Sequence, residues 1–236
     1  YASRGLGDVY KRQGLSMRGV IWYQGENNTN RAKEYYHLFP AMINDWRKKW
    51  GKDFPFYWVQ LANYMDAVEV PSESLWAQVR EAQTQTLSLP HTGQAVIIDI
   101  GEAKDIHPKN KQEVGRRLAL HALHNDYGFS DVVCESPMPK TVRRVQDKIV
   151  VQFDNVADGL IVKNKYGYLM SFAVAGNDGV YKWVQAKVAG KDRVVLSCPD
   201  VIDPVSVRYA WGDNPDDANL YNSVGLPATP FEIKIE

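Results

Sequence analysis

The sequence predicts an α/β fold, in which part of a doubly wound parallel sheet is followed by a small all-β, sandwich-like domain. In the first half of the chain, short apolar runs alternate with segments of helical apolar spacing, and this alternation is typical of parallel sheets covered by helices. After about residue 137 the helical spacing stops, and short strand-like runs alternate with turn residues. We expect one domain at residues 14–130 and a second at residues 137–236.

Residues 1–13 are expected to be a non-native leader. They have no apolar periodicity, and their last six residues, DVYKRQ, resemble the translated adapter tail found on reading frames from environmental DNA. The tripeptide at residues 7–9 is similar to a Gly-Asp-Ser nucleophile motif, but Val9 has no hydroxyl group. We therefore leave this segment out of the predicted fold and assign it no catalytic role.

Three apolar runs rich in β-branched and aromatic residues predict buried parallel strands, at residues 19–23, 56–61 and 95–100. Helical spacing predicts three helices, at residues 31–50, 74–87 and 108–125. A break or kink is expected at Pro40, and Pro108 suits the first turn of the last helix. Ligands bind at the carboxyl ends of strands in such sheets, so we expect a site in the polar loops 24–30 and 101–107.

The second half predicts short antiparallel strands. Runs of alternating or continuous apolar residues mark the expected strands, at residues 148–153, 168–175, 181–188, 193–197 and 205–211. Turn sequences such as Asn-Asp-Gly at residues 177–179 separate them. A sequence of short strands between turns favours a small sandwich.

Composition and charge exclude several classes of partner. Hydrophobic residues make up 44% and charged residues 24% of the chain, which is ordinary for a globular protein. Lys+Arg and Asp+Glu are equal at 28 each, so the basic excess of a nucleic-acid-binding protein is absent. No apolar stretch approaches the roughly 20 residues that span a bilayer. We expect a small neutral molecule or a sugar chain as partner, and neither nucleic acid nor a membrane.

Cysteine and histidine positions predict no metal site. The sequence has no CxxC motif, and Cys134 and Cys198 could pair but are too few and too distant to form a disulfide framework. His121 and His124 share a helix face, but no carboxylate is expected to complete a metal triad with them, so we predict structural roles. His37 is similarly expected to be a surface or packing residue.

The loop after the first predicted strand reads Gln24-Gly25-Glu26-Asn27. A glycine between polar side chains lets the backbone approach a ligand closely, and the amide of Gln24 can donate to a developing oxyanion. The alternative is that these side chains only connect the strand to the next helix and cap it. The residues alone leave both interpretations open.

The second polar loop contains His107, between a strand end and a proline-initiated helix. The carboxylate of Asp105, two residues earlier, could accept one ring N–H and prepare the histidine to act as a general base. The alternative is a histidine that only caps the helix. A glycosidase carboxylate pair of Glu26 and Asp105 is a third and weaker hypothesis, because Glu26 suits a hydrogen-bonding role beside Gln24.

The segments GVIWYQGEN at residues 19–27 and DIHPKNK at residues 105–111 resemble the sialate O-acetylesterase family of SGNH/GDSL-type hydrolases. Further matching segments occur in the order that this family shows: LFP (38–40), DWR (45–47), VQLAN (59–63), REAQ (80–83), VRYAW (207–211), NLYN (219–222) and GLPA (225–228). The resemblance covers essentially residue 14 to the C-terminus. Two long motifs with ordered segments between them are far more specific than one short pattern.

The resemblance implies a serine-type carbohydrate esterase that removes O-acetyl groups from sialic acid or related glycans through an acyl-enzyme. It implies that His107 is the catalytic base, that Gln24 is the side-chain donor to the oxyanion, and that Asp105 is the best candidate to orient the base. Gly25, Glu26 and Asn27 accompany Gln24 on the substrate side. The resemblance implies no metal or organic cofactor and a periplasmic or secreted location.

The sequence departs from the family pattern in three places. The nucleophile segment of GQSN type and an oxyanion glycine segment precede the QGE loop in the family, and neither is found here, since Ser16 is a poor substitute. Many relatives have aspartate three residues before the histidine, where this chain has Lys104, so a backbone carbonyl could orient His107 instead of Asp105. Asn27 stands where relatives often have serine or alanine.

These departures predict that the chain is a truncated part of an esterase and is inactive alone. The alternative is a non-catalytic module that binds glycans or has a structural role. A serine-bearing segment in the complete gene would distinguish the two hypotheses.

Overall fold

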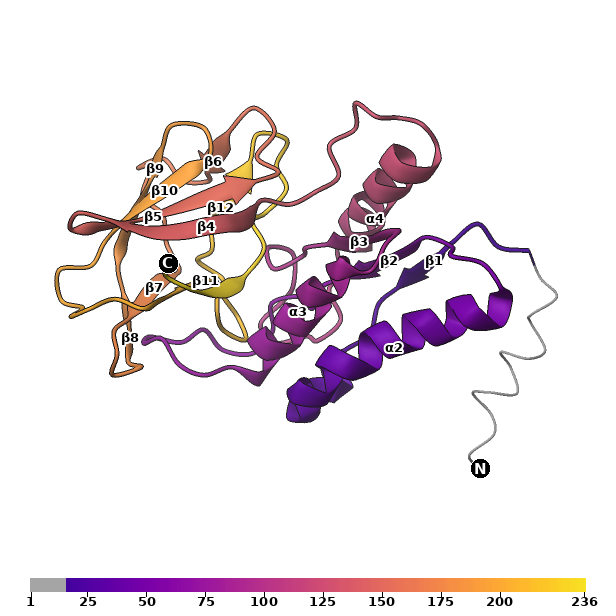
Figure 1. The fold of residues 1–236 in the computed structure, drawn as a ribbon, viewed down its shortest axis with the longest axis horizontal. Coiled ribbons are helices and arrows are strands. Elements are labelled where there is room, and N and C mark those ends of the chain that lie inside the picture. Colours follow the sequence, from indigo (N-terminus) through magenta and orange to yellow (C-terminus); the bar gives the residue numbers. More distant parts are fainter. Residues whose placement is uncertain (1–15) are drawn as a thin grey trace.

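The computed structural model describes residues 16–236, and the first half of this range forms a three-stranded parallel sheet in the order β1-β2-β3 (Figure 1). The strands are β1 (Val20–Trp22), β2 (Phe56–Val59) and β3 (Thr92–Ala95). The helices of this half are α2 (Ala32–Trp50), α3 (Leu75–Gln85) and α4 (Lys111–Asp126), with short 3-10 helices η1 (Glu26–Arg31) and η2 (Thr86–Ser88). The expected leader at residues 1–13 lies outside the described residues.

Helices cover both faces of the sheet, because successive side chains of a strand point to opposite sides. Phe56 and Trp58 of β2 belong to the apolar cluster that holds the buried faces of α2 and α3. Tyr57 and Val59 belong to the cluster that holds the buried face of α4. The prediction of a parallel sheet between helices is therefore confirmed, and β2 is buried on both sides. The prediction that the first strand is buried is wrong, because Ile21 of β1 is 71% exposed.

Helix α2 runs from residue 32 to residue 50 without the break that was expected at Pro40. Its buried stripe includes Tyr35, Phe39 and Ile43, which pack on the sheet on both sides of the proline in sequence. Burial of this stripe offsets the hydrogen bond that proline removes. The helix ends at Gly51, whose φ of 62° lies in the left-handed region that favours glycine.

The third strand pairs earlier in the sequence than predicted. The apolar run at residues 95–100 suggested the strand, but β3 ends at Ala95. Beyond it, Ile97 lies in the cluster with α4, while Val96 and Ile98 lie in the core of the second half of the chain. The segment is apolar because two different cores bury it, so hydrophobicity alone placed the strand incorrectly.

Helix α4 begins at Lys111 and not at Pro108 as predicted. The side chain of Asn110 accepts a hydrogen bond of 3.2 Å from the backbone N–H of Glu113, so Asn110 is the N-cap. The three residues before the helix therefore remain in the loop that carries His107.

The second half contains two four-stranded antiparallel sheets and a two-stranded sheet. The first sheet, in the order β4-β5-β10-β9, consists of β4 (Met138–Val145), β5 (Lys148–Asp154), β10 (Arg193–Ser197) and β9 (Gln185–Ala189). The second, in the order β13-β11-β7-β8, consists of β13 (Phe231–Lys234), β11 (Ser206–Tyr209), β7 (Phe172–Ala175) and β8 (Tyr181–Trp183). The small sheet pairs β12 (Leu220–Asn222) with β6 (Leu160–Val162).

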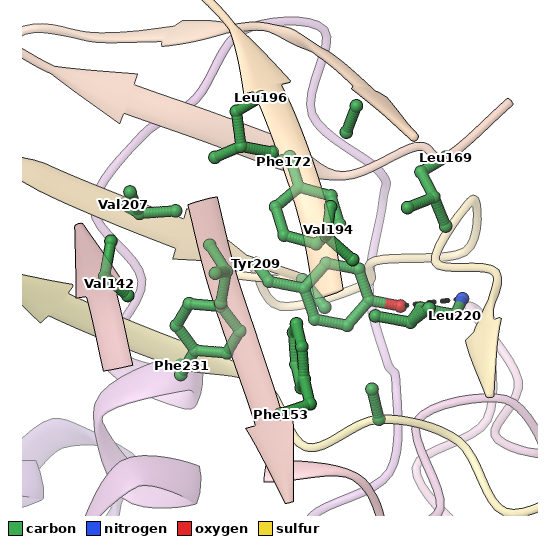
Figure 2. Close-up of a cluster of buried hydrophobic side chains, with 14 of the residues drawn as sticks. Val142, Phe153, Leu169, Phe172, Val194, Leu196, Val207, Tyr209, Leu220 and Phe231 are labelled. Atoms are coloured by element: carbon green, nitrogen blue, oxygen red, sulfur yellow. Dashed lines mark hydrogen bonds between the residues drawn. The ribbon is translucent and has the colours of Figure 1, made fainter. Parts of the chain in front are cut away.

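One apolar core joins the two larger sheets, as Figure 2 shows. Three aromatic rings lie at its centre: the centroids of Phe172 and Tyr209 are 4.6 Å apart, and those of Tyr209 and Phe231 are 6.0 Å apart. The hydroxyl of Tyr209 accepts a hydrogen bond of 3.0 Å from the backbone N–H of Leu220, which ties β12 to this core. This arrangement agrees with the predicted sandwich-like architecture.

Several strands of the second half differ from prediction. The run 181–188 is two strands, β8 and β9, which belong to different sheets, and the run 205–211 stops pairing before Ala210, whose φ is 50°. Four strands, β4, β6, β12 and β13, were not predicted. β6 and β12 have only three residues each, which is too short for a clear apolar pattern. β4 is an edge strand whose one buried side chain is Val142, so it shows no clear apolar pattern either.

A charged network joins α4 to the second half of the chain. The guanidinium of Arg117 contacts both oxygens of Asp99, at 2.6 and 2.9 Å, and it donates to Glu113 at 2.8 Å. The hydroxyl of Tyr221 in β12 donates to Asp99 at 3.3 Å. Hydrogen bonds from Arg116, and then from Arg117, lower the pKa of Glu113 to about 2.

Replacing Glu113 by glutamine should flatten the acid side of the stability profile. Because the folded-state pKa of about 2 lies below the ordinary value of 4.5, the carboxylate stabilises the fold above pH 4.5, and this contribution is lost as pH falls toward 2. We expect the urea midpoint of the wild-type chain to fall more steeply between pH 5 and pH 2 than that of Glu113→Gln. Glu34→Gln, at an exposed pair on α2, should keep the wild-type slope; equal slopes for wild type and Glu113→Gln would contradict the account.

Candidate active site

The two polar loops singled out from the sequence line one open cleft of about 340 Å³ beyond the carboxyl end of β1. The cleft lies where the segment after β1 approaches the segment before α4. Its lining residues are Tyr23, Gln24, Glu26, Asn27, Ile106, His107, Pro108 and Lys111. The structure therefore brings Gln24 and His107 together, although they are 83 positions apart in the sequence.

Gln24 is held by contacts with the first two helices of the sheet. Its backbone carbonyl accepts hydrogen bonds from the hydroxyl of Tyr35 at 3.1 Å and from Nε2 of Gln83 at 3.3 Å. Its Nε2 donates to Oδ1 of Asn28 at 2.6 Å. Because a primary amide has two N–H groups, one of them remains for a ligand in the cleft.

Gly25 allows the chain to turn against α3. Its φ of 153° is a conformation that residues with side chains rarely adopt. A Cβ atom at this position would lie 3.2 Å from both Gln83 and Leu61. Gly25 thus sets the position of Gln24 through backbone geometry, and the residues after it form η1 and not the loop that was expected.

His107 lies at the rim of the cleft, and its side chain is 85% exposed. Its ring nitrogen Nδ1 is 3.7 Å from Oδ1 of Asp105, which is longer than a hydrogen bond. The same carboxylate oxygen accepts a hydrogen bond of 2.9 Å from the backbone N–H of His107. Asp105 thus holds the backbone of His107 and faces the ring without a hydrogen bond to it.

The positions of the carboxylates Glu26, Asp105 and Glu102 bear on the hypothesis of a glycosidase pair. Glu26 lines the cleft, whereas Asp105 is not among the lining residues and lies 3.7 Å from the ring of His107. Two carboxylates that flank a bond from opposite sides, as a glycosidase requires, are therefore not presented here. Glu102 is part of the support of the loop, since its carboxylate accepts a hydrogen bond of 2.7 Å from Nζ of Lys109.

The remaining candidates differ in position. Asn27 is exposed at the cleft. Ser16 is exposed before the amino end of β1, whereas Gln24 follows its carboxyl end, so the strand separates the two. His37 is exposed on α2, as expected for a surface residue.

Sequence reasoning missed a chain of amides that supports the loop of His107. Asn63, which follows β2, accepts a hydrogen bond of 2.7 Å from the backbone N–H of Gly101 through Oδ1. Its Nδ2 donates to Oδ1 of Asn214 at 2.9 Å, and Asn214 donates to the carbonyl of Met65 at 2.8 Å. A Cβ atom at position 101 would lie 2.2 Å from the Asn63 carbonyl oxygen, so only glycine fits. Asn63 occurs in a matching segment of the sequence, but no pattern indicated its contact with the second half.

No carboxylate was expected to complete a metal triad with His121 and His124, but Glu135 and Cys134 lie near His121 without His124. One ligand atom each of His121, Cys134 and Glu135 lie within 4.8 Å of one another. His124 is not part of this group; its Nδ1 lies 2.8 Å from the carbonyl oxygen of Val132. Cys134 and Cys198 are both free and buried, so they do not pair.

No helix within residues 16–236 combines the length and the apolar character that a membrane span requires.

Comparisons with known proteins identify the family to which the chain is related. A family model described as "Carbohydrate esterase, sialic acid-specific acetylesterase" matches residues 7–124. A sialate O-acetylesterase from Homo sapiens is 30% identical over 245 residues, covering 92% of this chain and 46% of the relative. One from Mus musculus is 29% identical over 258 residues, covering 96% and 46%. The chain thus spans about half the length of these relatives.

A solved structure of a carbohydrate acetylesterase has a similar fold. The crystal structure of a carbohydrate acetylesterase from Xanthomonas citri superposes with a TM-score of 0.88 at 44% identity, covering 94% of this chain and 51% of that one. Both cleft segments lie within the residues that the family model matches. The chain belongs to the carbohydrate esterase family of sialic acid-specific acetylesterases.

Proposed function

We propose that the protein to which this chain contributes removes O-acetyl groups from sialic acid or related glycans, by a serine esterase reaction on an SGNH-type sheet. The observation that carries the proposal is the shared cleft of the Gln24 amide and the His107 imidazole beyond the carboxyl end of a parallel strand. Membership of a family of acetylesterases supports the reaction class, and the names of the relatives support the substrate class.

In the proposed reaction His107 moves protons. Its Nε2 accepts the proton of the attacking serine hydroxyl as the Oγ–carbon bond to the acetyl group forms. The imidazolium then gives this proton to the sugar oxygen as the ester bond breaks, which leaves an acetyl-serine. Water attacks that ester with His107 as base again, and acetate and free serine result. Nδ1 faces Asp105, and closing their 3.7 Å separation by about 1 Å would fix the ring for these transfers.

Gln24 has the electrostatic role. When the carbonyl carbon becomes tetrahedral, its oxygen gains negative charge, and a donor already fixed in position stabilises that charge without reorganisation. The backbone contacts of Gln24 with Tyr35 and Gln83 provide such fixation. Burial raises the pKa of Tyr35 to about 12, so its hydroxyl stays protonated and continues to donate at working pH.

The attacking serine is proposed to come from a segment outside these 236 residues. Ser16 lies at the wrong end of β1 to reach the cleft. We expect the present chain to hydrolyse p-nitrophenyl acetate no faster than buffer, and a longer chain with a GQSN-type segment to hydrolyse it and to release acetate from O-acetylated sialic acid. Activity of the present chain that is lost in Ser16→Ala would reject this assignment, and inactivity of the longer chain toward both esters would reject the proposed function.

Replacing Gln24 by alanine in the longer, active protein should lower kcat by ~10²–10³-fold with little change in KM, because the lost donor acts mainly on the transition state. The fold should persist, since Tyr35 still donates to the backbone carbonyl of residue 24. Asn30→Ala, in η1 but outside the cleft lining, is the matched control and should keep wild-type kcat. Equal kcat values for the two variants would show that Gln24 is not the oxyanion donor.

A further inference from the structure

A second group of chemically reactive side chains lies away from the cleft, where α4 meets the segment that connects it to β4. His121 is on α4, and Cys134 and Glu135 lie between the end of α4 at Asp126 and the start of β4 at Met138. Nδ1 or Nε2 of the histidine, the Cys134 sulfur and a Glu135 carboxylate oxygen all lie within 4.8 Å of one another.

In its neutral form, the imidazole of His121 presents a lone pair to this group. Its Nε2 is 3.0 Å from the backbone carbonyl oxygen of Gln94, which can only accept, so Nε2 carries the proton in the neutral ring. Nδ1 is then the nitrogen with the lone pair. It is fully buried and has no hydrogen-bond partner among residues 16–236, and Oε1 of Glu135 lies 3.5 Å from it. A buried nitrogen without a partner is costly unless a further group satisfies it.

The ring has no freedom to turn away. It stacks on Tyr57, with centroids 5.5 Å apart and an interplanar angle of 23°. On another side, a Cβ atom at Gly93 would lie only 2.5 Å from Nδ1, so glycine at this position makes the space for the ring. The sheet therefore holds Nδ1 in a fixed direction, as the supporting contacts of a metal-binding histidine do.

The three ligand atoms fit a divalent cation of zinc type. Thiolate, imidazole and carboxylate form the mixed set that zinc accepts, and hard cations such as magnesium do not favour sulfur. In a tetrahedral site the nitrogen and oxygen ligands are about 3.3 Å apart, close to the 3.5 Å between Nδ1 and Glu135. The Glu135 side chain is 38% exposed, so solvent can reach the group and supply the fourth ligand.

We propose that His121, Cys134 and Glu135 form a zinc-type metal site that fastens the connecting segment to the α/β half of the protein. Binding would exchange the thiol proton of Cys134, released to solvent, for a sulfur–metal bond. The backbone carbonyl of Glu135 also accepts a hydrogen bond of 3.2 Å from Asn222 of β12. The metal would thereby fix the path of the chain from α4 into the β-sheets, and its role is structural and separate from the esterase reaction.

The test uses the 236-residue chain, stripped of metal with a chelator, loaded with Zn²⁺ or Co²⁺ and desalted. We expect about one zinc per chain, a thiolate-to-cobalt charge-transfer band, and a rise in melting temperature with zinc, because the metal binds the folded state. Cys134→Ser should lose the band and weaken zinc binding by at least ~10-fold. Cys198→Ser removes the other buried cysteine and should behave as wild type.

Glu135→Gln provides a second variant that should keep the fold, since Glu135 is partly exposed, and it should also weaken zinc binding. Loss of the band and of zinc in both variants, with Cys198→Ser unchanged, supports the site. Absence of the cobalt band in the wild-type chain, or equal zinc content in Cys134→Ser and wild type, would overturn it and leave a histidine–carboxylate pair without metal. Zinc content and the cobalt band do not depend on esterase activity, so these measurements test the metal site independently of the proposed function.

Discussion

Replacing His107 by alanine in the longer, active protein should lower kcat for release of acetate by ~10⁴–10⁶-fold, because the variant lacks the proposed acceptor of the serine proton. The effect should be on catalysis and not on folding, since the side chain is 85% exposed. The measurement is the initial rate with p-nitrophenyl acetate and with O-acetylated sialic acid, accompanied by the far-UV circular dichroism spectrum of each variant.

His37→Ala is the matched control for this experiment. His37 is also an exposed histidine, but it lies on α2 outside the cleft lining, so its replacement should leave kcat unchanged. If His107→Ala kept more than about a tenth of the wild-type kcat, while His37→Ala was normal, His107 would not be the proton acceptor.

Replacing Arg80 by methionine should lower the free energy of unfolding by ~3–5 kcal/mol. Arg80 is fully buried on α3, and its guanidinium donates to four backbone carbonyls. Two belong to the segment after β2, Leu61 at 2.8 Å and Ala62 at 2.7 Å, and two to the second half of the chain, Gly212 at 2.6 Å and Asp213 at 2.9 Å. Methionine fills similar space but removes all of these donors. Ala62 keeps a hydrogen bond from Trp76 Nε1 and Asp213 keeps one from the backbone N–H of Tyr64. The carbonyls of Leu61 and Gly212 lose the one donor that they have within residues 16–236.

The geometry also predicts how the variant unfolds. Because Arg80 joins carbonyls of both halves, its loss should separate the urea transition of the α/β half from that of the β-sheets. Burial lowers the pKa of Arg80 to about 9, so the group remains cationic in a neutral buffer, where the experiment is done. Arg116→Met, at a half-exposed ion pair on α4, is the control and should cost less than about 1 kcal/mol. Equal midpoints for the two variants would contradict the role given to Arg80.

The sequence predicted those parts of the fold whose burial is simple. The strand at residues 193–197 agrees with β10, because its side chains alternate between one core and the surface. The run 95–100 was misplaced because Val96 and Ile98 serve one core and Ile97 another. A hydrophobic run reports that a segment is buried and does not report which neighbour buries it.

The candidate site was predictable as far as strand ends and chemistry define it. Gln24 and His107 follow different strands of one parallel sheet, and that topology was enough to expect a shared crevice. The contacts that support the site were not predictable, because Asn63 and Asn214 are 151 residues apart in the sequence and no local pattern indicates that they meet. The same holds for His121, whose partners come from a connecting segment without regular structure.

The central claim is that Gln24 and His107 act on one reacting carbonyl carbon. The most direct measurement is a crystal structure of the longer protein after reaction with a phosphonate ester, whose tetrahedral phosphorus stays attached to the nucleophilic serine. The account predicts a phosphonyl oxygen about 2.7–3.1 Å from Nε2 of Gln24, and Nε2 of His107 within hydrogen-bonding distance of the serine Oγ. An adduct bound elsewhere, or one whose oxygen meets neither side chain, would contradict the account.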